Sequence, residues 1–141
     1  MKNVVGIRRE NVDATERRAP LSPEQVGELV SRHGLRVVVE PSPRRVFTDD
    51  EYAAAGAEIS SDLGECNAVF GVKEIPVADI RPEGAYCYFS HTIKAQRYNM
   101  PMLAHIVDVR ATLLDYELVT NESGRRIIFF GDRSRFTSPS R

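Results

Sequence analysis

The chain has 141 residues, 42% of them hydrophobic and 28% charged, which is typical of a single globular domain with a substantial core. Its formal net charge of −1 provides no overall field that would attract nucleic acid or an anionic membrane. No run approaches the roughly 18 apolar residues of a membrane-spanning helix. We therefore expect neither a nucleic-acid partner nor a membrane partner.

The two cysteines indicate a compartment. Cys66 and Cys87 stand in apolar runs and lack the spacing of metal ligands, which favours reduced core residues over a disulfide and predicts a reducing environment. No signal or transit segment is evident before Val4, where structure is expected to begin. These features predict a cytoplasmic protein.

Short runs rich in aliphatic and aromatic residues predict the strands. In chain order they are residues 3–8, 36–40, 57–60, 67–72, 85–90, 111–115 and 126–130. A nearly continuous apolar run such as RVVVE is typical of a parallel strand that is covered on both faces.

The first helix has a clear start and stop. Ser22 and Gln25 form a capping-box pattern with Pro23 at the first helical position, and Gly34 is a helix-stopping residue. Val26, Leu29 and Val30 give the helix its apolar face.

Two further helices are predicted downstream. A second capping box, Thr48 to Glu51, opens a short helix over residues 49–55 that Gly56 ends. The pattern over residues 93–110 is also helical, but Pro101 removes a backbone donor, so we expect a break or kink near Met100. Strands that alternate with helices predict an α/β fold with three layers, a parallel sheet flanked by helices.

Charged residues gather at the ends of the predicted strands. Lys73 and Glu74 follow one strand, His91 follows another, and Asp115 and Glu117 stand at the end of a third. Carboxyl ends of parallel strands meet at one edge of a sheet, so these groups could converge into an acid/base set. The alternative is that they are polar residues where strands meet solvent.

The remaining candidates have two readings as well. The pairs Arg17-Arg18 and Arg125-Arg126 could hold carboxylates, because guanidinium binds them bidentately, or they could be solvated surface charge. His33 is interpreted as a helix-surface residue, and so is His105. The sequence has no G-x-G-x-x-G, P-loop, H-E-x-x-H or C-x-x-C motif, so it shows no dinucleotide fingerprint.

Six motifs carry a family resemblance. GIRRENVDATERRAPLSP, EPSPRRVFTDDEY, GVKEIP, YFSHTIKAQ, LLDYELV and GRRIIFFG resemble, in this order, the N-terminal domain of lysine–2-oxoglutarate reductase. This is the reductase portion of bifunctional aminoadipic semialdehyde synthase and is similar to fungal saccharopine dehydrogenase. Alanine dehydrogenase and transhydrogenase look like more distant kin. The match covers Val4 to Gly131 and implies a flavodoxin-like substrate domain.

The resemblance also implies a reaction and its residues. The family joins the lysine ε-amine to 2-oxoglutarate and reduces the imine with NAD(P)H to give saccharopine, or runs the reverse reaction. The implied catalytic acid/base residues are Lys73 and His91. The implied pKa-tuning carboxylates are Glu74 and Glu117. The implied groups for substrate carboxylates are Arg18 of ERRAP and Arg126 of GRR, and Lys94 of HTIKAQ is implied as a further substrate-binding residue at the same rim.

The end of the chain departs from the family pattern. The family continues after FG with an Ala/Gly-rich helix that leads into a Rossmann domain, whereas residues 132–141 read DRSRFTSPSR. We expect a substrate domain over residues 1–131 and a polar, disordered tail over 132–141. We expect the Rossmann cofactor domain to be absent, so that NAD(P)H serves the full-length family and no cofactor binds this chain.

These implications set the expected partners and the rival hypotheses. The expected ligands are 2-oxoglutarate, lysine or saccharopine, and an uncovered apolar surface predicts a homo-oligomer or a Rossmann-domain partner. Whether the chain is an enzyme stays open, because it should be inactive alone. The alternatives are a stand-alone binding or regulatory domain that lost catalysis, or part of an alanine dehydrogenase-like enzyme. Animal relatives make a mitochondrial location the alternative compartment.

Overall fold

Six parallel strands form the central sheet of the computed structural model, which describes residues 3–92 and 97–128. Their order in the sheet is β3-β2-β1-β4-β5-β6. Their bounds are Val4–Ile7 for β1, Arg36–Val39 for β2, Glu58–Ile59 for β3, Ala68–Phe70 for β4, Ala85–Tyr88 for β5 and Thr112–Asp115 for β6.

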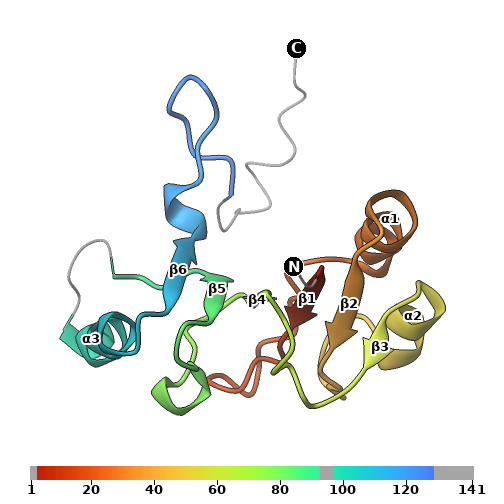
Figure 1. The fold of residues 1–141 in the computed structure, drawn as a ribbon, viewed down its shortest axis with the longest axis horizontal. Coiled ribbons are helices and arrows are strands. Elements are labelled where there is room, and N and C mark those ends of the chain that lie inside the picture. Colours follow the sequence, from red (N-terminus) through yellow and green to blue (C-terminus); the bar gives the residue numbers. More distant parts are fainter. Residues whose placement is uncertain (1–2, 93–96, 129–141) are drawn as a thin grey trace.

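Helices connect these strands. The α-helices are α1 (Pro23–His33), α2 (Asp49–Ala54) and α3 (Met100–Asp108), and the 3₁₀ turns are η1 (Val77–Asp79), η2 (Arg97–Asn99) and η3 (Tyr116–Leu118). Figure 1 shows α1 and α2 beside the β1–β3 half of the sheet and α3 beside the β5–β6 half. Of the described helices, none is long and apolar enough to cross a membrane.

The helices begin and end where their capping residues predict. At the start of α1 the Ser22 side chain accepts a hydrogen bond from the Gln25 backbone N–H, and the Gln25 side chain accepts one from the Ser22 backbone N–H. At its end, Gly34 adopts the left-handed conformation with φ 63°. Thr48 and Glu51 form the same reciprocal pair at the start of α2. Both predicted capping boxes are confirmed.

The core lies on both faces of the sheet. Val69 of β4 is paired with Gly6 of β1, so its side chain lies on the face opposite that of Ile7. Ile7 packs with Val26 of α1 and with Tyr52 of α2 in one cluster. The other cluster, against α3, contains Val69, Tyr86, Tyr88, Met102 and Ile106. Two covered faces confirm the predicted three-layer parallel α/β fold.

The chain reverses its direction of winding at β1. β2 and β3 follow on one side of β1, and β4, β5 and β6 follow on the other. In such doubly wound sheets, the crevice at the carboxyl ends of the strands beside this reversal is the usual place for a ligand. Here the loops after β1 and β4 border this crevice.

The predicted last strand differs from the structure. Arg126 forms an isolated antiparallel bridge with Thr120, and the described residues 126–128 of the predicted last strand do not join the sheet. The Asn121 side chain accepts from the Ser123 and Arg125 backbone N–H groups and folds the segment into a local hairpin, which projects away from the sheet in Figure 1. Residues 129–130 lie outside the described part.

The third predicted helix is shorter than its sequence pattern. η2 gives way to α3 at Met100, and Pro101 occupies the first turn of α3, where its missing N–H costs little. The break expected near Met100 is therefore where α3 begins, and residues 93–96 lie outside the described part.

Candidate functional site

Titratable side chains collect at the carboxyl edge of the sheet. Lys73 and Glu74 follow β4, His91 follows β5, and Glu117 stands in η3 directly after β6. Parallel strands β4, β5 and β6 are neighbours in the sheet, so their carboxyl ends bring these side chains to one rim.

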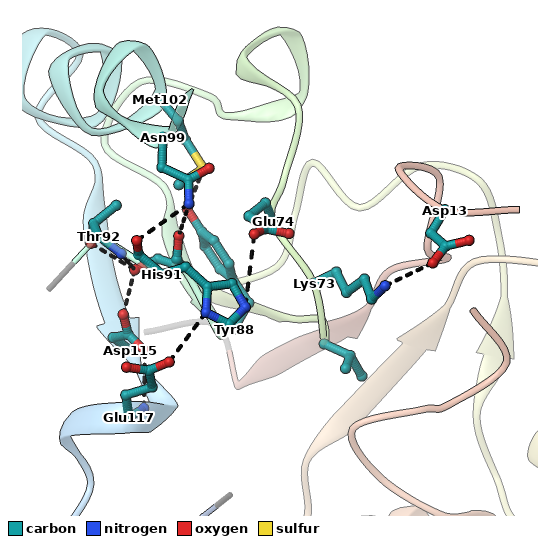
Figure 2. Close-up of polar contacts among 12 residues, drawn as sticks. Asp13, Lys73, Glu74, Tyr88, His91, Thr92, Asn99, Met102, Asp115 and Glu117 are labelled. Carbon is teal, nitrogen blue, oxygen red and sulfur yellow. Dashed lines mark hydrogen bonds and ion pairs between the residues drawn. The ribbon is translucent and has the colours of Figure 1, made fainter. Parts of the chain in front are cut away.

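His91 lies between two carboxylates. Its Nδ1 is 3.2 Å from Glu117 Oε1, and its Nε2 is 3.8 Å from Glu74 Oε1. The side chain of His91 is 30% exposed, that of Glu117 19% and that of Glu74 20%, so solvent reaches these three side chains only in part. Figure 2 shows the imidazole reaching toward both carboxylates from the end of β5. The arrangement can accept, hold and donate a proton.

The backbone of His91 is held in an unusual conformation. Its φ of 55° lies in the left-handed region, which costs a residue with a side chain free energy. The buried Asn99 side chain donates from Nδ2 to the carbonyl oxygens of Ser90 at 2.9 Å and of His91 at 3.3 Å. This donor from the turn before α3 secures the conformation.

Lys73 is directed toward the loop after β1. Its Nζ donates to Asp13 Oδ2 at 2.8 Å and is 3.7 Å from Glu16 Oε2. The hydrogen bond to Asp13 raises the pKa of Lys73, and the same bond holds the pKa of the Asp13 carboxyl well below its usual range. Figure 2 shows Lys73 turned to Asp13 while its neighbour Glu74 turns to His91.

A buried carboxylate fixes the backbone at Lys73. Glu10 Oε1 accepts the backbone N–H of Lys73 at 2.6 Å and that of Val72 at 3.2 Å. Burial raises the pKa of Glu10, and the two backbone hydrogen bonds and the Arg8 guanidinium oppose that rise. Glu10 therefore ties the loop after β1 to the loop after β4.

Arg18 already faces a carboxylate of its own loop. Its Nε and Nη2 donate to the two oxygens of Glu16 at 2.8 and 2.6 Å, and this pair lowers the pKa of Glu16 and raises that of Arg18. Arg18 is 49% exposed and Glu16 only 5%, so the guanidinium stays accessible at the rim. Glu16 also lies 3.7 Å from Lys73, which places Arg18 in the Lys73 cluster.

The other two predicted cations are placed differently. Arg126 is exposed, and its Nη2 donates to the Ile128 carbonyl oxygen at 3.2 Å within its own hairpin. Lys94 lies outside the described residues. The structure thus brings His91 together with Glu74 and Glu117, and it joins Lys73 and Arg18 through Glu16.

Several residues of the rim were not predicted from the sequence. Glu10, Asp13 and Glu16 stand in one charged loop directly after β1, and Asn99 stands before Pro101. The loop could have been identified because it follows the strand at which the winding reverses. Asn99 carries no comparable signal. The two other histidines serve elsewhere: His33 is exposed, as predicted, whereas His105 is half-buried with Nε2 3.2 Å from the Ile80 carbonyl.

The crevice beside β1 does not fit a dinucleotide. Doubly wound domains that bind one place its pyrophosphate on a glycine-rich turn after the first strand. Here the turn carries Glu10, Asp13 and Glu16, and the Arg8 side chain lies against Gly71. Residues 8–18 contain no glycine, and these carboxylates pair with Arg8, Lys73 and Arg18. The turn therefore lacks the glycine-rich cradle on which a pyrophosphate would lie.

Fold and site together define a class of protein. A doubly wound parallel α/β domain with acid/base and cationic groups at its carboxyl edge has the architecture of a small-molecule-binding domain. The chain matches the family model for the N-terminal domain of alanine dehydrogenase/PNT over residues 6–137, and it belongs to this family.

Curated relatives narrow the comparison. The chain is 45% identical over 133 residues to alpha-aminoadipic semialdehyde synthase of Arabidopsis thaliana and 42% identical over 130 residues to the protein of Bos taurus named alpha-aminoadipic semialdehyde synthase, mitochondrial. It is 33% identical over 126 residues to saccharopine dehydrogenase (NAD(+), L-lysine-forming) of Neurospora crassa. These alignments cover 91%, 92% and 86% of the chain, but the chain spans only 12%, 14% and 34% of the three relatives.

Proposed function

We propose that this chain is the substrate-side domain of an oxidoreductase that forms or cleaves saccharopine in lysine metabolism. The observation that carries the proposal is the imidazole of His91 between the carboxylates of Glu74 and Glu117, at the carboxyl edge of the sheet. The names of the relatives, alpha-aminoadipic semialdehyde synthase and saccharopine dehydrogenase, support it.

His91 would act as the acid/base group. Joining an amine to an oxo acid, or releasing it, requires several proton transfers to nitrogen and oxygen, and an imidazole can give and take protons near neutral pH. Glu74 and Glu117 lie beside the two ring nitrogens, within reach of a proton carried there. They also give the amine end of a substrate a negatively charged surface.

Lys73 and Arg18 would bind the acidic end of the substrate. Guanidinium holds a carboxylate bidentately, and Arg18 already does so with Glu16. Lys73 is also the second catalytic acid/base residue that we propose beside His91: the hydrogen bond to Asp13 raises its pKa, so in the ligand-free chain it is a cation and would act as the proton donor. A substrate carboxylate would share or displace these internal carboxylates. Arg126 and Lys94 are the further cations that we assign to substrate carboxylates.

The hydride donor would come from elsewhere. Because the crevice beside β1 does not fit a dinucleotide, the NAD(P)H of the family would bind another part of the polypeptide or a partner chain. We expect no turnover with NAD(P)H by these 141 residues alone. The edge strand β6 and its exposed Leu114, with Leu118 nearby, offer a surface for that partner or for a second copy. The name of the cattle relative favours the mitochondrial alternative over a cytoplasmic location.

A calorimetric titration of the chain with 2-oxoglutarate tests the proposal. We expect saturable binding that Arg18→Ala weakens by about tenfold or more, since a charged hydrogen-bonded contact is worth roughly 1.5–3 kcal/mol. Arg36→Ala is the matched control. Arg36 Nε and Nη2 also donate to one carboxylate, that of Glu58, at 2.9 and 3.0 Å, and this pair lies at the opposite end of the strands from the site.

The same titration with saccharopine in the His91→Ala variant tests whether the imidazole contacts the substrate, and we expect weaker binding than by the unmodified chain. Equal weakening by Arg18→Ala and Arg36→Ala would contradict the assignment of Arg18. Absence of 2-oxoglutarate and saccharopine binding by the folded chain would contradict the substrate-side function and favour a scaffold or regulatory domain.

A further inference from the structure

A cavity of about 390 Å³ lies between the loop after β1, the connection from β3 to β4 and the η1 turn. Small-molecule sites have volumes of roughly 300–1,000 Å³. None of the described residues that line it belongs to the group around His91 or to the Lys73 cluster. Its charged lining consists of guanidinium groups and an equal number of carboxylates, from Arg8, Arg9, Arg81, Glu40, Asp79 and Glu83. These charges balance, which favours a ligand that is neutral overall and carries one charge of each sign.

Arg8 is the buried cation of this cavity. Its side chain is 5% exposed, and its Nη2 donates to Asn11 Oδ1 at 2.8 Å and to Asp79 Oδ2 at 3.3 Å. Among the described residues, its Nη1 has no hydrogen-bond partner, because Glu10 Oε2 lies 3.9 Å away, beyond hydrogen-bond distance. A buried donor without an acceptor costs free energy. The guanidinium therefore has a donor to offer to a further carboxylate oxygen.

Asp79 marks the place where a carboxylate binds in the cavity. Its Oδ2 accepts from Arg8 Nη2 and from Asn11 Nδ2, the latter at 3.1 Å. The Asp79 side chain is 46% exposed, so water can hydrate its carboxylate when the side chain turns away from Arg8. Arg8 and Asn11 thus form a donor pair whose present acceptor is an exchangeable side chain.

We propose that this cavity binds a neutral α-amino acid, whose carboxylate accepts from Arg8 and Asn11 and whose ammonium group pairs with Asp79. The ligand separates Arg8 from Asp79 and gives each of them a partner of opposite charge. Bidentate binding by the guanidinium takes up Nη1 together with Nη2. This site is separate from the rim that carries His91, so the inference goes beyond the proposed function.

The experiment is a ¹H–¹⁵N NMR titration of the 141-residue chain with L-glutamine, following the Arg8 Nε–H and Asn11 side-chain amide signals. Glutaramate, which has the same carbon skeleton without the α-ammonium group, is the matched probe. We expect saturable shifts with L-glutamine. Glutaramate should bind about tenfold more weakly, because it cannot pair with Asp79 and must compete with it.

Two substitutions test the assigned contacts. Arg8→Met should weaken the binding of L-glutamine by about tenfold or more, since the ligand carboxylate loses its charged donor. Arg36→Met is the matched control, because Arg36 pairs with Glu58 on the surface outside the cavity, and it should leave binding unchanged. Asp79→Asn should weaken L-glutamine, which loses its ammonium partner, and strengthen glutaramate, which loses its competitor. These opposite signs cannot arise from a general loss of structure.

Two results would overturn the proposal. One is the absence of saturable shifts at Arg8 and Asn11 when L-glutamine is added to the folded chain. The other is a change of the same sign for both probes in Asp79→Asn, since the ammonium group would then play no part. If Arg8→Met does not fold, Asn11→Ala removes one donor at an exposed residue and should weaken L-glutamine severalfold, and unchanged binding would refute the assignment. A failed 2-oxoglutarate titration would count against the proposed function alone.

Discussion

His91 and Lys73 follow neighbouring strands, yet the molecule holds them by different interactions. The backbone around His91 is fixed by buried hydrogen bonds from Asn99 and through Asp115. The Lys73 ammonium is held by charge, through Asp13 and Glu16 in a loop. Both clusters border the same rim, and only the second depends on groups that solvent ions can screen.

This difference indicates how each group would work. A proton-transfer group needs a fixed position, because misplacement by about 1 Å can cost on the order of a hundredfold in rate. A side chain that binds a substrate carboxylate needs a positive charge and enough freedom to exchange one carboxylate partner for another. His91 has the first kind of support and Lys73 the second. Substitutions at Asn99, His91 and Lys73 test that contrast.

Asn99→Ala should reduce the free energy of unfolding by about 2 kcal/mol, because two carbonyl oxygens at a buried position lose their donor. Urea denaturation measures the loss. Asn67→Ala is the control, since the exposed Asn67 makes one comparable bond, from the Val4 N–H at 3.1 Å. Equal losses of unfolding free energy in the two variants would contradict the idea that the Asn99 hydrogen bonds stabilise the backbone at His91 more than an exposed hydrogen bond would.

His91→Gly should be more stable than His91→Ala by about 1 kcal/mol, since only glycine adopts a φ of 55° without a steric cost. Thermal or urea unfolding of the pair gives the difference. The order should reverse at the exposed helical position Glu28, where glycine is the worse residue by about 1 kcal/mol. An alanine variant at position 91 as stable as the glycine variant would show that the backbone relaxes without cost.

Lys73→Met should flatten the pH dependence of stability. The pKa of Asp13 is lowered from 3.8, so its pairing stabilises the fold above that pH and is lost as the pH falls through the lowered value. The pKa of Lys73 is raised from 10.5, so its contribution is present below that pH and is lost as the pH rises through the raised value. Urea midpoints across the pH range measure both limbs.

The salt dependence of stability distinguishes the Lys73 cluster from the His91 cluster. The Lys73→Met effect should be the smallest of the three and shrink with added salt, because these side chains are partly exposed. The Asn99→Ala effect should not change with salt. Equal salt sensitivity would mean that charge also governs the His91 cluster.

Elements whose signals are local could be predicted from the sequence alone. Ser22 with Gln25 and Thr48 with Glu51 mark helix starts because each cap bonds to residues within one turn. Apolar runs placed the six sheet strands, and their alternation with helices gave the fold class. His91, Lys73, Glu74 and Glu117 could be named as rim residues because carboxyl ends of parallel strands share an edge.

The pairing of those rim residues depends on how the chain packs and could not be predicted from the sequence. Lys73 and Glu74 are adjacent in sequence, yet one turns to Asp13 and the other to His91, a choice made by contacts with segments 60 and 17 positions away. Asp115 and Asn99 acquire their roles in the same way, since a buried polar group must find its partners wherever the packed strands bring them. Residues 126–128, the described part of the predicted last strand, stay out of the sheet for the same reason: a strand forms where a partner edge is available, and the hairpin at Asn121 directs these residues away from the sheet.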